Sequence, residues 1–121
     1  MKKSEAKAHC DGLGRTLAMP LNLEEQRFIE AFARKKLEDP EVRTGKNMQF
    51  WIGISDEQME EHWMYDDESP VSDKFSAWAT GQPDNGGPYG SSAENCGAIG
   101  EKAEMKWTDV NCNLKLKFFC A

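Results

Sequence analysis

The amino-acid sequence contains no long hydrophobic run. A helix that spans a bilayer needs about 20 consecutive apolar residues, and no segment of the 121 residues approaches that length. The start also lacks the apolar core of a signal peptide. Met1 is followed directly by Lys2, Lys3 and a helix-like segment, which looks like a truncated start. We therefore expect no membrane contact by this domain, and we expect that a native signal, stalk or anchor lies outside these residues.

Basic residues are too few to give the chain a positive charge. There are 15 lysines and arginines against 21 acidic residues, which leaves a formal net charge of −6. Such a charge opposes binding to nucleic-acid phosphates and to anionic membrane surfaces. Cations and neutral ligands are the better candidates, and we expect no nucleic-acid partner.

Side chains typical of catalytic and zinc sites are also scarce. The only histidines are His9 and His62, and no two cysteines have the C-x-x-C spacing of zinc or redox sites. The sequence has no nucleophile elbow. The acidic run 66–68 lies in one turn, where adjacent carboxylates point to different faces and lack the separation that glycoside hydrolysis requires. We predict that the protein is not an enzyme.

The four cysteines are widely spaced, and their number is even. This arrangement favours two disulfides in an oxidising compartment, and therefore an extracellular domain that is secreted or part of a membrane-protein ectodomain. The alternative is a cytosolic protein with four buried free thiols. The cysteines are Cys10, Cys96, Cys112 and Cys120.

Two helices are predicted in the first third of the chain. Residues 4–13 place apolar side chains at helical spacing and end beside two glycines. Residues 23–37 follow Asn22 as an N-cap, with Glu25 at the capping-box position. We expect an apolar stripe on the second helix from Leu23, Phe28, Ile29 and Phe32.

Short strands are predicted in the remainder. Residues 50–54 are rich in aromatic and branched side chains and read as a central strand. Segments 96–99, 105–107 and 115–120 read as closing strands. Between the strands predicted at 50–54 and 96–99, the chain from 66 to 94 is mostly irregular and rich in proline, glycine and acids. A loop of this length in a small domain is usually functional or disordered.

Four ordered motifs in this sequence resemble the C-type lectin-like domains. They are Trp51-Ile52-Gly53-Ile54, Gln82-Pro83-Asp84, Glu94-Asn95-Cys96 and the segment from Trp107 to Cys112. The resemblance covers nearly the whole chain and is closest to galactose-type, collectin-like and tetranectin-like members. It implies one domain over residues 1–121.

The resemblance implies an α+β fold. Two helices should flank small antiparallel sheets, and a long calcium-binding loop should emerge from one of them. By the same resemblance, Cys10 should bond Cys120, and Cys96 should bond Cys112 beneath the loop. The family's first strand, which normally precedes the first helix, is expected to be missing here.

The same resemblance implies a calcium site. It assigns Gln82, Asp84, Glu94 and Asp109 as ligands, with Thr108 at a further ligand position. Calcium takes about six to eight oxygen ligands and prefers carboxylates and carbonyls, which this set supplies. The alternative is that each of these residues is only a solvated loop side chain.

Through the calcium ion, the resemblance implies binding of a glycan or glycoprotein. The Gln-Pro-Asp order is typical of galactose or N-acetylgalactosamine specificity, with Gln82, Asp84, Glu94 and Thr108 contacting the sugar and Tyr89 stacking on it. Sugar-binding members usually have asparagine where this chain has Thr108, which lacks an amide donor. The alternative is therefore a calcium-binding module of the same fold that engages a protein partner at the long loop.

A second, auxiliary calcium site is implied less completely. Besides Glu94 it would use Asp56, Glu60, Asn85 and Asn95, although asparagine at 95 replaces a usual aspartate. Spaced acids such as Asp56 and Glu60 are also typical of a solvated face. Any oligomer would form through a flanking segment that lies outside these residues.

Overall fold

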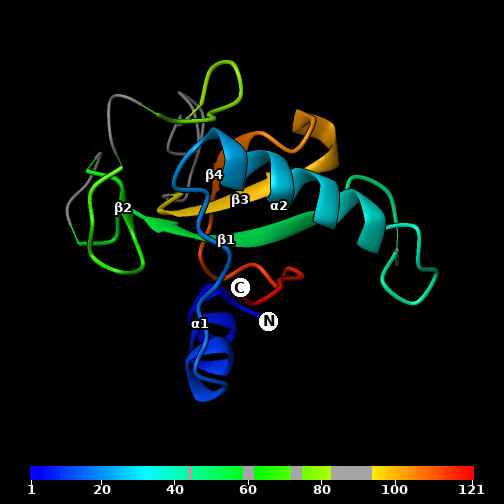
Figure 1. Ribbon diagram of the computed structural model, residues 1–121, viewed down its shortest axis with the longest axis horizontal. Helices are drawn as coiled ribbons and strands as arrows, with labels where there is room; N and C mark the ends of the chain where they lie inside the picture. Colours follow the sequence, from blue (N-terminus) through cyan, green and yellow to red (C-terminus); the bar gives the residue numbers. More distant parts are fainter. Residues whose placement is uncertain (44, 59–61, 72–74, 83–93) are drawn as a thin grey trace.

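The computed structural model describes residues 1–43, 45–58, 62–71, 75–82 and 94–121 (Figure 1). In this part of the chain, two α-helices flank a four-stranded antiparallel sheet with the strand order β2-β1-β3-β4. The helices are α1 (Lys3–Gly12) and α2 (Leu23–Lys36), and the strands are β1 (Gln49–Ser55), β2 (Met64–Tyr65), β3 (Cys96–Gly100) and β4 (Trp107–Val110), with a short 3-10 helix η1 (Glu101–Ala103) after β3. The predicted α+β fold with two flanking helices is confirmed.

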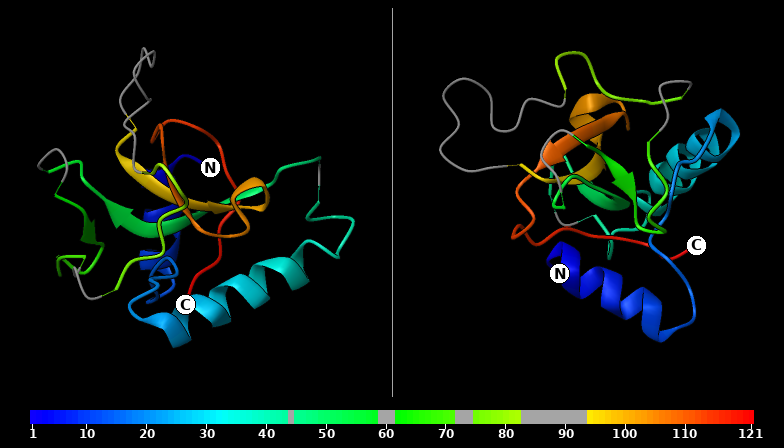
Figure 2. Two further views of the ribbon diagram at one scale, coloured as in Figure 1. Left: turned by 90° about the horizontal axis from the view of Figure 1, so that it is seen from above. Right: turned by 90° about the vertical axis from the view of Figure 1, so that its left-hand side faces the viewer.

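Strand β1 is buried on both faces, which explains why its sequence is continuously apolar. Phe50, Ile52 and Ile54 belong to a core that includes the buried side chains of α2. Trp51 points the other way, into a second core that includes Ala6 and Cys10 of α1. The sheet therefore lies between the two helices, as the turned views also show (Figure 2).

Both disulfides pair as the resemblance implied. Cys10 of α1 bonds Cys120, and Cys96 at the start of β3 bonds Cys112. The first disulfide joins α1 to the end of the chain, and the second ties β3 to the segment that follows β4. The alternative of four free thiols is excluded.

The capping of α2 follows the prediction, but its buried face differs from the expected stripe. The Asn22 side chain accepts a hydrogen bond from the backbone N–H of Glu25 at 2.9 Å. The residues that α2 buries are Gln26, Ile29 and Ala33, whereas Phe28 is 64% exposed. The predicted stripe was right for Ile29 and wrong for Phe28 and Leu23, which lie outside the face that meets the sheet. A polar residue, Gln26, finds hydrogen-bond partners inside that face.

Two of the predicted closing strands differ from the structure. The strand expected at 105–107 begins only at Trp107, because Glu104 and Met105 have φ angles of 53° and 62°, outside the extended region. Residues 115–120 form isolated bridges and no ladder: Lys117 pairs with Phe50, and Cys120 with Leu17. Position by position, this segment contacts different elements, so no continuous strand partner exists for it.

Met1 pairs with the segment that precedes the C-terminus. The amino group of Met1 donates to the carbonyl of Leu116 at 3.1 Å, and the Leu116 N–H donates back to the Met1 carbonyl at 3.0 Å. The Met1 carbonyl also accepts the indole N–H of Trp51 at 2.8 Å. None of the helices in the described ranges has the length and apolar character needed to cross a membrane.

Candidate functional site

A groove of about 700 Å³ lies beside β4. Residues 82 and 94, which flank the long loop in the sequence, both line this groove. Its walls come from β4, from the turn at residues 79–82, from residue 94 and from the region around η1. The groove brings together the four predicted calcium-site residues that the structure describes. They are Gln82, Glu94, Thr108 and Asp109.

Strand β4 holds two of these residues through its pairing with β3. In the antiparallel register, Thr108 lies opposite Ala98 and Asp109 lies opposite Gly97. The position of Gly97 is sterically restricted, because a Cβ there would meet Cγ1 of Ile54 at 2.2 Å. The close packing of β3 against β1 thus fixes the strand on which the site residues lie.

The segment before the long loop runs along the other edge of β4. The N–H of Trp107 donates to the carbonyl of Ala77, and the Trp107 carbonyl accepts the N–H of Ala79, both at 2.8 Å. A turn bond from the N–H of Gln82 to the Ala79 carbonyl, at 2.9 Å, then closes the segment. These bonds bring Gln82 next to β4, where its side-chain oxygen accepts the Asp109 backbone N–H at 3.4 Å.

The groove wall contains buried oxygen atoms. Asp109 is only 3% exposed. The hydroxyl oxygen of Thr108 is buried and has no hydrogen-bond partner in the described structure. A buried hydroxyl without a partner is costly, and a bound water molecule or ion would satisfy it. The donor set of hydroxyl, amide and carboxylate oxygens suits a hard cation such as calcium.

Two members of the implied principal site lie outside the described residues. These are Asp84, a predicted calcium ligand, and Tyr89, the predicted stacking residue. The backbone N–H of Asp56 donates to the Asn95 carbonyl at 3.0 Å, so these two members of the implied auxiliary site are neighbours. Glu60 and Asn85, two further members, lie outside the described residues. Neither Asp56 nor Asn95 lines the groove.

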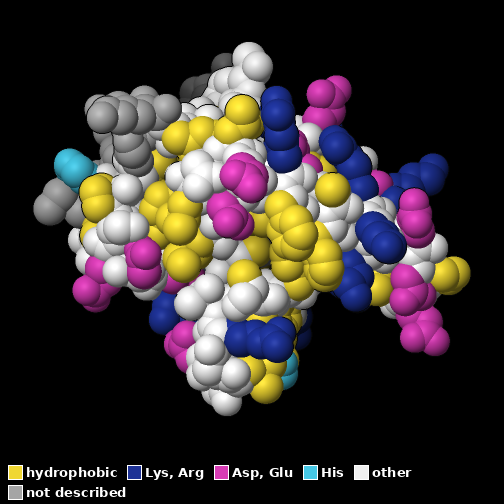
Figure 3. Space-filling model, in the orientation of Figure 1, with side chains coloured by type: hydrophobic (Ala, Val, Ile, Leu, Met, Phe, Trp, Pro, Cys, Tyr) yellow, Lys and Arg dark blue, Asp and Glu magenta, His cyan; other side chains and the backbone are white. Residues whose placement is uncertain are grey.

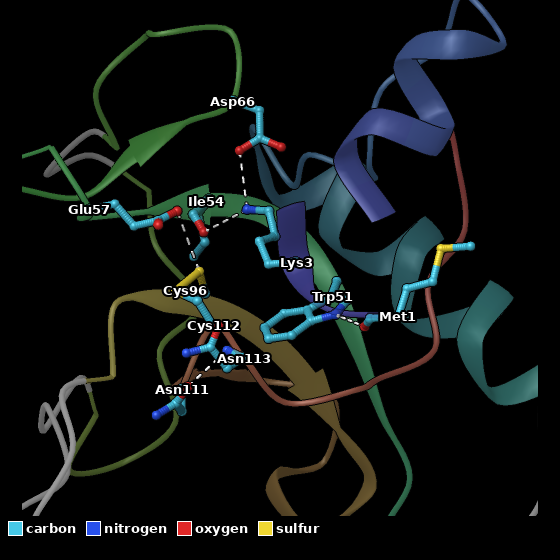
Figure 4. The surroundings of a disulfide bond; sticks show 10 residues. All are labelled: Met1, Lys3, Trp51, Ile54, Glu57, Asp66, Cys96, Asn111, Cys112 and Asn113. Atoms are coloured by element: carbon cyan, nitrogen blue, oxygen red, sulfur yellow. Dashed lines mark hydrogen bonds and ion pairs between the residues drawn. A yellow bond between two sulfur atoms is a disulfide. The ribbon is translucent and has the colours of Figure 1, made fainter. Parts of the chain in front are cut away.

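A different cluster of potential metal ligands is excluded by its chemistry. Glu57, Cys96 and Cys112 form the one group of three His, Cys, Asp or Glu ligand atoms within 4.8 Å of one another in the described ranges. The two sulfur atoms are bonded to each other, as Figure 4 shows, so neither is a thiolate that could bind a metal. We assign this cluster to the disulfide alone.

Sequence reasoning missed a buried ion pair on the α1 side of the sheet. The Lys3 ammonium lies 3.2 Å from a carboxylate oxygen of Asp66 and donates to the Ile54 carbonyl at 3.3 Å (Figure 4). Burial lowers the pKa of Lys3, and the attraction of Asp66 only partly offsets this effect. The sequence gives no signal for this pair, because its members are 63 residues apart and each resembles an ordinary surface charge.

Comparisons with known proteins agree with this architecture. A family model described as the lectin C-type domain matches residues 1–121. The chain is 30% identical over 116 residues to C-type mannose receptor 2 of Homo sapiens, covering 96% of this chain but 7% of that protein. It is 33% identical over 116 residues to collectin-11 of Danio rerio, covering 96% of this chain and 37% of that protein. It is also 28% identical over 118 residues to perlucin of Haliotis laevigata, covering 97% of this chain and 67% of that protein.

Solved structures give the same result. The carbohydrate-recognition domain of the mouse scavenger receptor C-type lectin superposes with a TM-score of 0.77 at 28% identity, covering 98% of this chain and 80% of that one. The C-type carbohydrate-recognition domain of cow CD23, solved in the presence of a GlcNAc2Man3 oligosaccharide, gives a TM-score of 0.75 at 26% identity, covering 99% and 78%.

Proposed function

The chain belongs to the C-type lectin domain family, a family of non-enzymatic binding modules, and from this premise we propose that it is a calcium-dependent carbohydrate-recognition domain. The groove beside β4 is the proposed binding site. We further propose that the domain works outside the cell, in a secreted protein or an ectodomain. Its two disulfides support this location, because such bonds persist in oxidising compartments.

The observation that carries the proposal is the meeting of four oxygen-bearing side chains at one groove. Gln82 comes from the turn before the long loop, Glu94 from the point where the described chain resumes, and Thr108 and Asp109 from β4. Asp84 would complete this set from the loop. A calcium ion held there would supply coordination positions for two neighbouring hydroxyl groups of a sugar.

The residues around the ion would determine which sugar binds. Carboxylate oxygens accept hydrogen bonds from sugar hydroxyls, whereas an amide also donates them. The order Gln82-Pro83-Asp84 places the amide before the acid, and this order supports a galactose or N-acetylgalactosamine preference. Tyr89 would then stack on the apolar face of the sugar, a contact that aromatic rings commonly make.

Thr108 is expected to weaken the site. Its hydroxyl can approach a cation as a neutral oxygen, but it does not offer the additional N–H donors of an asparagine side chain. We therefore propose that a single domain binds sugar weakly and that strong attachment to a glycan surface requires several copies acting together.

Calorimetry on calcium-depleted protein tests this proposal directly. Calcium is titrated first, and galactose and mannose are then added separately to the calcium-loaded protein. We expect calcium to bind, and galactose to bind more tightly than mannose. Calcium binding without any sugar response would favour the protein-binding alternative, and the absence of calcium binding would overturn the proposed site.

A pair of matched variants assigns the calcium signal to the groove. Glu94→Gln keeps the size of the side chain and removes one negative charge, so calcium affinity should fall at least about tenfold, since affinity depends on ligand charge. Glu38→Gln makes the same change at an exposed position outside the groove and should leave the affinity unchanged. Equal effects of the two variants would contradict the assignment.

A further inference from the structure

The outward face of α2 carries a ridge of four side chains. Glu24, Phe28, Ala31 and Lys35 are spaced by four, three and four residues, so they follow one another along a single side of the helix. All four are exposed, while the opposite side of α2 packs against the sheet. Figure 3 shows this face, with hydrophobic side chains over the middle of the helix, acidic ones toward its start and basic ones toward its end.

Phe28 is the apolar centre of the ridge. Its side chain is 64% exposed, and it stacks on Phe32 with 6.1 Å between ring centroids. The ring centroid of Phe32 lies 4.7 Å from that of Phe119, and the centroid of Phe119 lies 5.9 Å from that of the buried Phe50. A row of aromatic rings thus connects Phe28 to the core, so a large hydrophobic group is presented to solvent from a firmly packed support.

The ends of the ridge carry opposite charges. Glu24 lies in the first turn of α2 and Lys35 in the last turn, and neither forms an ion pair or hydrogen bond through its side chain with any other described residue. Most neighbouring side chains follow the same division, with acid at residue 25 and bases at 34 and 36. The ridge itself is therefore negative at its start, apolar at its middle and positive at its end, although Arg27 and Glu30 also lie in the middle of the helix.

Such a face is complementary to itself when two copies of the helix run in opposite directions. An antiparallel pair centred between residues 29 and 30 places Glu24 opposite the partner's Lys35, and Phe28 opposite the partner's Ala31. The small alanine leaves room for the ring. A parallel pair would instead oppose like charges at both ends.

We propose that the occupant of this face is a second copy of the same chain, and that two copies associate through α2 about a two-fold axis. The contact is isologous, as in most homodimers, because each copy contributes the same four residues. No residue of α2 lines the groove beside β4, so the association leaves both grooves open. The proposal is independent of the proposed sugar specificity.

The contact is small, and this sets the expected strength. A helix of 14 residues is about 21 Å long at 1.5 Å per residue. Two such faces bury less than the roughly 1,200 Å² of a stable interface, so the association should be weak and concentration-dependent. We expect a dissociation constant between about 1 μM and 1 mM.

Sedimentation velocity of the whole chain from about 10 μM to 1 mM tests the association, with the range set by the expected affinity. The wild-type protein should shift from monomer toward dimer as its concentration rises. Phe28→Glu places a charge at the centre of the contact and should keep the protein monomeric. Asp11→Lys, an exposed change on α1 at the other side of the sheet, should dimerise like the wild type.

Charge exchange gives a sharper test of the antiparallel register. Glu24→Lys alone, or Lys35→Glu alone, opposes like charges and should weaken self-association at least about tenfold. Mixing these two single variants restores both ion pairs, so a heterodimer should form, and the double variant Glu24→Lys/Lys35→Glu should also recover. High salt should weaken the wild-type dimer, because exposed ion pairs are screened.

Each outcome decides for or against the proposal. A wild-type protein that stays monomeric to about 1 mM overturns it, since that is the weak limit of the expected range. A dimer that is unaffected by Phe28→Glu would have to use another face. If the single charge variants fail to associate when mixed, although thermal unfolding shows that each is folded, the antiparallel register is wrong.

Discussion

The indole N–H of Trp107 donates a hydrogen bond of 2.7 Å to the side-chain oxygen of Gln26. The amide nitrogen of Gln26 donates in turn to the Met105 carbonyl at 3.0 Å, and the whole side chain is buried, with 1% exposed. A single buried amide thus ties α2 to the start of β4. Because β4 carries Thr108 and Asp109, this bond also holds the strand of the candidate site.

Replacing Gln26 with leucine should destabilise the fold. Gln26→Leu leaves a buried indole N–H and a buried carbonyl without partners, and we expect the free energy of unfolding to fall by about 3 kcal/mol. Urea unfolding measures the difference. Arg27→Leu makes a comparable change at the next, exposed position and should alter stability little. Similar losses for both variants would mean that the buried bonds contribute nothing specific.

Breaking the buried Lys3 and Asp66 pair should cost more than breaking an exposed pair. Lys3→Met leaves the Asp66 carboxylate buried without its partner, and we expect a loss of about 3 kcal/mol. The double variant Lys3→Met/Asp66→Leu should recover much of that loss, because no buried charge remains. Lys7→Met removes an exposed pair with Asp11 and serves as the control with little effect. A double variant that is no more stable than Lys3→Met would contradict this account.

The lowered pKa of Lys3 predicts a dependence of stability on alkaline pH. Burial lowers this pKa in the folded state, so between the lowered value and the ordinary lysine value of about 10.4 the unfolded chain binds more protons. Raising the pH through that window therefore favours the folded state. The free energy of unfolding is measured at several pH values for the wild type and for Lys3→Met. The wild-type value minus the Lys3→Met value should rise with pH. A flat or falling difference would exclude the effect.

Adding one methyl group at Gly97 should strain the sheet. The new Cβ of Gly97→Ala would lie 2.2 Å from a side-chain carbon of Ile54, and overpacking of this kind typically costs about 1 to 3 kcal/mol. Gly12→Ala is the matched control, since a Cβ there meets nothing within 4 Å. Thermal unfolding should show a lower midpoint for the first variant only. An unchanged midpoint for Gly97→Ala would mean that Ile54 moves without cost.

Supplying an amide at position 108 should strengthen sugar binding. Thr108→Asn adds a carbonyl oxygen for calcium and N–H donors for a sugar hydroxyl. We expect galactose affinity to rise at least about tenfold, equal to about 1.4 kcal/mol, if the groove is a sugar site. Calorimetry with calcium present measures this. Thr80→Asn, at an exposed position in another part of the groove wall, should have no such effect. No gain from Thr108→Asn would count against the lectin role.

Several features of the fold could be predicted from the sequence because they depend on local pattern or on strongly shared motifs. The cap at Asn22 and the central strand β1 follow from capping chemistry and from a short apolar run. The two disulfide pairings followed from the resemblance of ordered motifs. The placement of Gln82, Glu94, Thr108 and Asp109 around one groove agrees with the same resemblance, although their role as calcium ligands remains a proposal.

The buried face of α2 and the Lys3 and Asp66 pair could not be predicted, because each depends on contacts between distant segments. Gln26 is buried only because Trp107 of β4 and Met105, just before β4, meet it, and Phe28 is exposed only because the sheet meets α2 on another side. Likewise, Met105 leaves the extended region because of the turn after η1, which shortens the predicted strand.

The sequence by itself therefore determined the helices and the central strand, since these depend on local spacing and pattern, while its resemblance to a family implied the disulfide pairing and the set of candidate ligands. Only the tertiary structure decided which polar groups are buried, which charges meet and which aromatic side chain remains at the surface. The physical reason is that burial and pairing are properties of two segments together, and neither segment's own pattern specifies the partner that it will meet.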